Sequence, residues 1–168
     1  MKRAVYPGTF DPMTMGHLDI LKRSSMLFDE VILAIAINEK KNTLFTIKER
    51  TEMALEATKD IKNIRVVPFE CLLVNFMRKI ESQIVIRGLR AVSDYEYELQ
   101  LALMNRKLDP DLDTVFFMPS QQFIFLSSSM VREIASLGGD VAPFVPSVVY
   151  KELIKKMGEP TDHICNIE

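Results

Sequence analysis

Short apolar segments that alternate with longer segments of helical periodicity constrain the fold of this 168-residue chain more than any other feature. The short segments are rich in Val, Ile or Phe, as buried parallel strands are. The repeat of strand, helix and strand predicts an α/β fold, a Rossmann-like five-stranded parallel sheet with helices on both faces. We predict strands at Arg3–Tyr6, Val31–Ile37, Ile64–Pro68, Ile84–Arg87 and Thr114–Met118. We predict helices at 16–28, 47–59, 72–81, 93–108 and 129–137, and a last helix that Ser147 caps and Gly158 ends.

The composition is that of an ordinary soluble protein. Hydrophobic residues make up 48% of the chain and charged residues 26%, as in globular domains. The length favours one domain at residues 1–158, followed by a flexible tail at 159–168. A net charge of −2 gives no reason to expect a nucleic-acid partner. No apolar run has the length of a membrane span or a signal-peptide core, and the cysteines match no metal-site spacing. We therefore expect a cytoplasmic protein with no membrane partner.

Residues suited to phosphate binding follow several of the predicted strands. The carboxyl ends of parallel strands meet at one edge of a sheet, and ligands bind there at the point where the winding reverses. If the first and fourth strands are neighbours, the loops that follow them form a cationic cleft with glycine turns. The residues at this edge are Thr9, Phe10 and His17 after the first strand, Lys40 and Lys41 after the second, Arg87, Gly88 and Arg90 after the fourth, and Ser127, Ser128 and Ser129 after the fifth.

The first of these loops leads from Pro7 into a helix. Pro7-Gly8 is expected to stop the strand, and Pro12 to delay the helix until Thr14. A glycine-containing turn and a helix start direct backbone N–H groups and a positive helix end at one point, which suits a phosphate. His17 lies in the first helical turn beside that point. A histidine there is more often a cap or a core residue, so it indicates a site only together with its neighbours.

Two further loops carry residues that bind anions, and each also has a simpler explanation. The loop Ile86-Arg87-Gly88-Leu89-Arg90 could be solvated, although arginine presents planar donors that suit phosphate oxygens. Ser127-Ser128-Ser129 precede a helix for which a single serine would be a sufficient N-cap. Three serines supply additional hydroxyl and N–H groups at a helix end that favours anions.

The sequence contains no evident nucleophile–base pair, zinc cluster or P-loop. Histidine, lysine, arginine and helix N-termini can position substrates and stabilise charge, and nucleotidyl transfer needs those two effects.

The motifs together resemble a known family. Thr14-Met15-Gly16-His17 fits the nucleotidyltransferase signature of His or Thr, any residue, Gly and His. With the loop at 86–91, the acidic Tyr-Glu pairs at 95–98 and the serine motif at 127–133, the chain closely resembles bacterial phosphopantetheine adenylyltransferases over residues 2–157. The resemblance implies an enzyme that transfers AMP from ATP to 4′-phosphopantetheine, giving dephospho-coenzyme A and pyrophosphate. It also implies a cytoplasmic homohexamer that uses Mg²⁺ held mainly by the nucleotide phosphates.

The resemblance further implies roles for individual residues of this chain. As catalytic residues it indicates His17, Lys41, Thr9 and Arg90. As ATP-binding residues it indicates Thr9, Phe10, His17, Gly88, Leu89, Arg90, Glu98, Phe123, Ile124, Phe125, Leu126, Ser127, Ser128 and Ser129. As residues that bind phosphopantetheine it indicates Thr9, Lys41, Leu73, Arg87, Asn105 and Glu133.

Two other functions remain open at this point. A related cytidylyltransferase would share the fold, but such enzymes usually carry His where this chain has Thr14. A nucleotide-binding sensor without turnover would be expected to lack His17 or Lys41, and both are present. The apolar stretch Phe123–Leu126 also departs from the more polar pattern of the family, and Cys71 begins the segment expected to contact the pantetheine arm.

Overall fold

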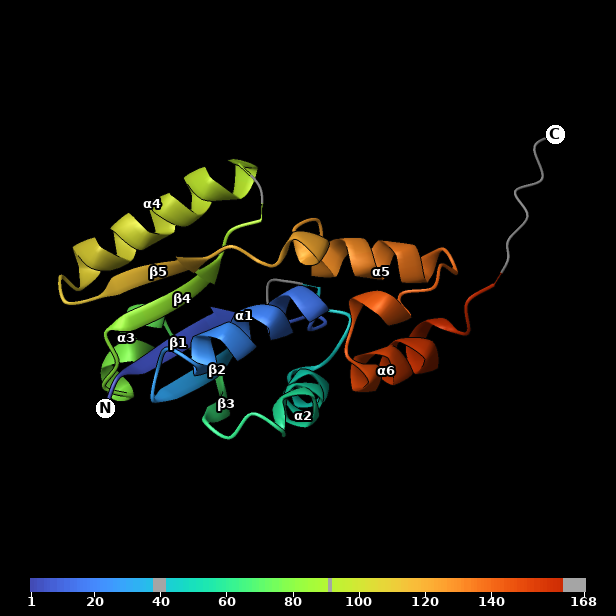
Figure 1. The fold of residues 1–168 in the computed structure, drawn as a ribbon, viewed down its shortest axis with the longest axis horizontal. Helices are drawn as coiled ribbons and strands as arrows, with labels where there is room; N and C mark the ends of the chain where they lie inside the picture. The colour runs from blue at the N-terminus through green and yellow to red at the C-terminus, as the bar shows by residue number, and fades with distance from the viewer. Residues whose placement is uncertain (38–41, 91, 162–168) are drawn as a thin grey trace.

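A five-stranded parallel sheet forms the centre of the computed structural model, which describes residues 1–37, 42–90 and 92–161, without the side chains of residues 92–94. The sheet order is β3-β2-β1-β4-β5, and every neighbouring pair is parallel. The predicted fold and the pairing of the first and fourth strands are thereby confirmed (Figure 1). The strands are β1 Arg3–Gly8, β2 Glu30–Ala36, β3 Ile64–Phe69, β4 Ile84–Gly88 and β5 Asp113–Phe117.

Helices cover both faces of the sheet because alternate strand residues are apolar on both sides. On β1, Ala4 and Tyr6 belong to one buried cluster, and Val5 belongs to the other. Residues from α1, α2, α5 and α6 complete the first cluster, and residues from α3 complete the second. The helices are α1 Met15–Ser25, α2 Ile47–Thr58, α3 Leu73–Lys79, α4 Val92–Leu108, α5 Ser128–Ser136 and α6 Ser147–Met157, with the short 3₁₀ turns Gln121–Phe123 and Ala142–Phe144.

The chain winds outward from β1 in two directions. From β1 it passes through β2 to β3, and it then returns to β4 on the other side of β1 and continues to β5. The winding therefore reverses between β1 and β4, where an open α/β sheet presents its ligand-binding crevice. In Figure 1 the arrowheads of β1 and β4 point toward α5 and α6, so the crevice lies on the side of the C-terminal helices.

The prediction that Pro7-Gly8 stops the first strand is wrong. Pro7 pairs with Ala34 and Gly8 with Ile35, while the ladder between β1 and β4 includes only Ala4 and Val5. The Pro7 carbonyl accepts from Arg87 on the β4 side. The N–H and C=O of one strand residue point to the same side of the strand. The N–H that Pro7 lacks would therefore point toward β4, at a position where the ladder between β1 and β4 has already ended, so the proline removes no ladder hydrogen bond.

Helix caps account for other differences at element ends. At the start of α2, Thr46 and Glu49 form a capping box. The predicted cap of the last helix is wrong, because Pro146 is the N-cap and Ser147 is already helical. The predicted tail falls largely in residues 162–168, which lie outside the described residues. Among the residues described, no helix combines the length and apolar character needed to cross a membrane.

Candidate active site

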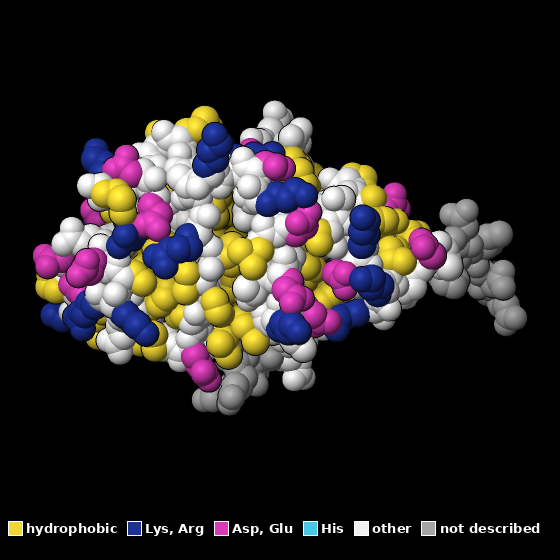
Figure 2. All heavy atoms as spheres, turned by 90° about the horizontal axis from the view of Figure 1, so that it is seen from below, with side chains coloured by type: hydrophobic (Ala, Val, Ile, Leu, Met, Phe, Trp, Pro, Cys, Tyr) yellow, Lys and Arg dark blue, Asp and Glu magenta, His cyan; other side chains and the backbone are white. Residues whose placement is uncertain are grey.

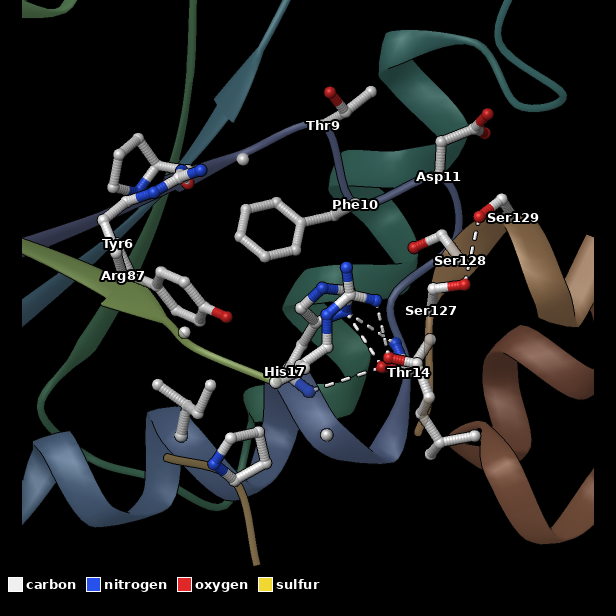
Figure 3. Close-up of a pocket in the computed structure, with 18 of the residues that line it drawn as sticks. Tyr6, Thr9, Phe10, Asp11, Thr14, His17, Arg87, Ser127, Ser128 and Ser129 are labelled. Carbon is white, nitrogen blue, oxygen red and sulfur yellow. Dashed lines mark hydrogen bonds between the residues drawn. The ribbon is translucent and has the colours of Figure 1, made fainter. Parts of the chain in front are cut away.

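A cavity of about 720 Å³ opens where β1 and β4 end, at the reversal of the winding. Four segments far apart in the sequence line it: the loop after β1 with the start of α1, residues 42 and 43, the end of β4 with the start of α4, and the approach to α5. Figure 3 shows Arg87 on one side of the cavity and Ser127, Ser128 and Ser129 on the other, with Phe10 and His17 between them. The predicted residues after β1, after β4 and before α5 therefore line one cavity, whereas Lys40 and Lys41 lie outside the described residues.

The start of α1 fixes the orientation of the His17 ring. Thr14 is the N-cap, and its hydroxyl accepts from the His17 backbone N–H at 3.4 Å. The Thr14 backbone N–H donates to His17 Nδ1 at 3.0 Å. Because a backbone amide can only donate, Nδ1 must be the acceptor, and the neutral ring carries its proton on Nε2. The cap therefore leaves one N–H on the imidazole for a ligand.

The surroundings of His17 keep its ring uncharged. Burial and, to a smaller extent, the positive charges of Arg90 and Arg87 together lower the pKa of His17 to about 4. The ring also meets Phe10 edge to face, with centroids 5.1 Å apart. At neutral pH His17 is therefore a neutral hydrogen-bond donor, and it does not serve as an acid with a pKa near 7.

Phe10 lies folded back over the end of β1. Its backbone φ of 49° lies in the left-handed region, which non-glycine residues seldom occupy. Its ring meets Tyr6 edge to face at 5.3 Å between centroids. A Cβ on Gly8 would lie 2.8 Å from the Phe10 ring. Gly8 is therefore required for the close approach of this ring, and positive φ plays no part at that position.

Arg87 lies at the end of β4 and is held by an acid and a carbonyl. Its Nε donates to Glu98 Oε2 at 2.6 Å, its Nη2 to Glu98 Oε1 at 2.5 Å, and its Nη1 to the Pro7 carbonyl at 2.8 Å. Burial opposes the charge, but the hydrogen bonds and negative charge of Glu98 raise the pKa of Arg87. The guanidinium is thus fixed in place and permanently charged at the cavity wall.

Arg90 connects the loop after β4 to the segment before α5. Its Nη1 donates to the Leu126 carbonyl at 2.8 Å, and both residues line the cavity. This contact brings a second guanidinium to the wall next to the serine motif.

The serines at the start of α5 have separate tasks. Ser127 is the N-cap, because its hydroxyl accepts from the Met130 N–H at 3.0 Å. The Ser128 hydroxyl donates to the Pro12 carbonyl at 2.7 Å and so joins α5 to the loop after β1. Within the described part of the chain, no hydrogen bond uses the backbone N–H of Ser128 or Ser129. These amides at a positive helix end form a ready anion site.

The cavity contains most of the residues that the resemblance indicated. Those that line it are Thr9, Phe10, His17, Arg87, Gly88, Arg90, Glu98, Phe123, Leu126, Ser127, Ser128 and Ser129. Outside the lining are Leu89, Ile124, Phe125, Leu73, Asn105 and Glu133, and the roles of all the indicated residues stay predictions. Leu73 begins α3, Asn105 lies on α4 and Glu133 on α5. Lys41 lies outside the described residues.

A hydrogen-bond network that the sequence did not indicate surrounds Asp11. The Asp11 carboxylate accepts from the backbone N–H of Leu44 at 2.8 Å and of Phe45 at 2.9 Å. It also pairs with Arg132 of α5 at 3.4 Å. Asn42 and Thr43, which likewise line the cavity, belong to the same wall. The pattern Asp-Pro in a turn gave no signal for this role, because the partners lie 33 or more residues away.

The fold and the site place the chain in a class of enzymes. A family model described as cytidylyltransferase-like matches residues 5–134, which include most of β1, the Thr14–His17 signature and the serine motif. The chain is therefore a member of the cytidylyltransferase-like nucleotidyltransferases.

Individual relatives narrow the assignment. The phosphopantetheine adenylyltransferase of Clostridium kluyveri is 52% identical over 156 residues, which cover 93% of this chain and 95% of that protein. The phosphopantetheine adenylyltransferase of Thermodesulfovibrio yellowstonii is 53% identical over 156 residues, covering 92% and 97%. This chain belongs to the phosphopantetheine adenylyltransferase family.

A solved structure supports the fold independently. A protein from Vibrio parahaemolyticus assigned as a nicotinate-nucleotide adenylyltransferase superposes with a TM-score of 0.68 and covers 94% of both chains. At 17% identity, this likeness shows the shared fold alone.

Proposed function

We propose that this chain transfers the adenylyl group of ATP to 4′-phosphopantetheine, and that pyrophosphate leaves as dephospho-coenzyme A forms. The single observation that carries the proposal is the convergence of His17, Arg87, Arg90 and the α5 N-terminus on one cavity. The family membership supplies the two substrates. A cavity of about 720 Å³ is of the size at which small-molecule sites occur.

The acceptor phosphate needs no general base. Its second pKa is about 6, so it is largely a dianion at neutral pH and can attack the α-phosphorus directly. Catalysis then requires alignment of the acceptor oxygen and neutralisation of charge on the α-phosphate. We assign the alignment to Thr9 with Lys41, and the binding of the acceptor phosphate to Arg87.

The hydrogen-bond donors of the cavity suit the neutralisation of charge on the α-phosphate. The Nε2–H of His17 is held by the Thr14 cap and can donate to an α-phosphate oxygen. Arg90 and the Ser128 and Ser129 amides provide positive charge and N–H groups for the other phosphates. We propose that the transfer is a direct in-line attack without a covalent intermediate.

A divalent metal ion fits this site as a companion of the nucleotide. Among the residues described, no group of three or more His, Cys, Asp or Glu could hold a metal ion. The two carboxylates of the lining, Asp11 and Glu98, are already engaged by amides and arginines. We therefore propose Mg²⁺ bound mainly by the ATP phosphates, where it would offset charge on the leaving pyrophosphate.

Assembly and location complete the proposal. We propose that residues 1–158 form one catalytic domain and that the protein is a cytoplasmic homohexamer. Large apolar side chains on α4 support association, because Tyr97, Leu103 and Met104 are 56–62% exposed in the single chain. On the face drawn in Figure 2, Lys and Arg alternate with Asp and Glu and no patch of one sign appears. Light scattering after gel filtration measures the assembly directly.

Pyrophosphate release tests the proposed reaction. The purified chain is incubated with Mg²⁺, 4′-phosphopantetheine and either ATP or CTP. We expect release with ATP that depends on 4′-phosphopantetheine. Preference for CTP would indicate a cytidylyltransferase, and nucleotide binding without release would indicate a sensor.

A further inference from the structure

Arg50 is buried beneath the active site and holds three backbone carbonyls at once. It lies in the first turn of α2, is 3% exposed and is not part of the cavity lining. Its Nη1 donates to the Thr9 carbonyl at 2.6 Å and to the Ala36 carbonyl at 3.0 Å, and its Nε donates to the Phe45 carbonyl at 3.1 Å. No carboxylate among the described residues forms a salt bridge with it. A charged group this deeply buried is costly to keep, so its three contacts call for an explanation.

The three carbonyls belong to two segments of the chain, the loop after β1 and the segment from the end of β2 to the start of α2, and Thr9 is the one among them that lines the cavity. Thr9 is in the loop after β1, whereas Ala36 ends β2 and Phe45 precedes α2. Asp11 holds the same two segments from the other side through the N–H groups of Leu44 and Phe45. Thr9, Asp11, Asn42 and Thr43 all line the cavity. One buried cation and one buried anion therefore fix the loop after β1 relative to residues 42–45.

We propose that Arg50 is a positioning residue for adenylyl transfer, because it sets the place of Thr9 against the wall formed by Asn42 and Thr43. The inference rests on the proposed function, in which Thr9 aligns the acceptor phosphate. Arg90 and the α5 N-terminus, to which we assign the ATP phosphates, form no hydrogen bond with Arg50 among those of the described residues. Arg50 thus acts through Thr9, to which the proposed function assigns the alignment of the acceptor phosphate.

The geometry requires a guanidinium. Arginine presents N–H groups in several directions of one plane, and here two nitrogens serve three acceptors. The single nitrogen of lysine cannot occupy both the Nε and the Nη1 positions. Arg50→Lys keeps the buried charge but releases at least one carbonyl, and the loop after β1 is then free to shift. A displacement of about 1 Å in a reacting group can reduce the rate about 10²-fold.

The test compares Arg50→Lys with Arg3→Lys as a matched control. Arg3 also donates to a distant carbonyl, that of Ile80, and to Glu30, but it begins β1 at the opposite edge of the sheet. We expect Arg50→Lys to lower kcat for AMP transfer about 10-fold or more, with a much smaller change in the dissociation constant for ATP. Arg3→Lys should leave kcat unchanged whatever its effect on melting temperature. If Arg50→Lys keeps the wild-type kcat, or weakens ATP binding as much as it slows transfer, the positioning role is refuted.

A measurement on the wild-type protein covers the case in which Arg50→Lys does not fold. The Arg50 Nε–H and Nη–H signals, assigned by NMR, should exchange slowly with water because three carbonyls hold the guanidinium. Rapid rotation and exchange would overturn the inference. If the wild-type protein transfers no AMP, the proposed function fails, whereas the NMR result still decides whether Arg50 holds the two segments together.

Discussion

The protonation state of His17 gives the most specific prediction of the site. The pKa of His17 lies at about 4, against a usual value of 6.5, because the ring is buried next to Arg90 and Arg87. At pH 7 the protonated fraction is then about one in 10³, and at pH 6 about one in 10². The imidazole should therefore remain a neutral donor, with its proton on Nε2, at pH 6 and above.

The same pKa shift makes stability depend on pH with a definite sign. Between pH 4 and 6.5 the unfolded chain binds a proton at His17 that the native chain does not. The free energy of unfolding therefore rises with pH in this window, and the contribution of His17 is complete above the unfolded pKa and lost as the pH falls toward 4. A lowering from 6.5 to about 4 corresponds to at most about 3 kcal/mol, because water in the cavity screens part of the effect.

NMR of ¹⁵N-labelled imidazole measures both the position of the proton on the His17 ring and the pKa of His17. The chain contains two histidines, so His163→Gln leaves His17 as the only signal. We expect a protonated Nε2, an unprotonated Nδ1 and a titration midpoint well below 5. A midpoint near 6.5 would refute the effect of burial beside Arg90 and Arg87, and a proton on Nδ1 would refute the role of the Thr14 cap.

Three further predictions concern single side chains. His17→Ala should lower kcat about 10²-fold or more while ATP affinity, measured by calorimetry, changes only a few-fold; equal losses in both would contradict a transition-state donor. Arg87→Met leaves the buried Glu98 without its partner and should lower the free energy of unfolding, measured with urea, by about 1–3 kcal/mol. The double variant Arg87→Met with Glu98→Gln should recover part of this loss. An unchanged urea midpoint for Arg87→Met would argue against a stabilising pair. Gly8→Ala places a methyl group 2.8 Å from the Phe10 ring and should lower the free energy of unfolding by about 1–3 kcal/mol. An unaltered urea unfolding curve would show that the ring moves freely.

The architecture was predictable because its signals are local. The apolar runs that became β2 and β3 contain Val and Ile on both faces, which only a sheet covered on both sides can bury. The parallel arrangement then placed the loops after β1, β4 and β5 at one edge, as the cavity lining confirms. Residues far apart in sequence could be brought together in this way without knowledge of any single contact.

The residues that hold the loops were not predictable, since their partners are remote. Arg50 follows Lys48 and Glu49 and reads as part of a solvated helix face, yet its partner Thr9 lies 41 residues away. Asp11 reads as a turn residue, yet it joins α5 to residues 44 and 45. A capping role for His17 was an alternative from the sequence, but the reciprocal box with Thr14 was not predicted, because histidine replaces the usual Glu or Gln.

The central claim is that this cavity aligns two bound substrates and contributes no nucleophile of its own. The stereochemistry at the α-phosphorus tests it most directly, with ATP carrying a single sulfur of known configuration on that phosphorus. One in-line displacement by 4′-phosphopantetheine must invert the configuration in the adenylylated product. Inversion is the predicted result, and retention would require a covalent enzyme intermediate and contradict the account.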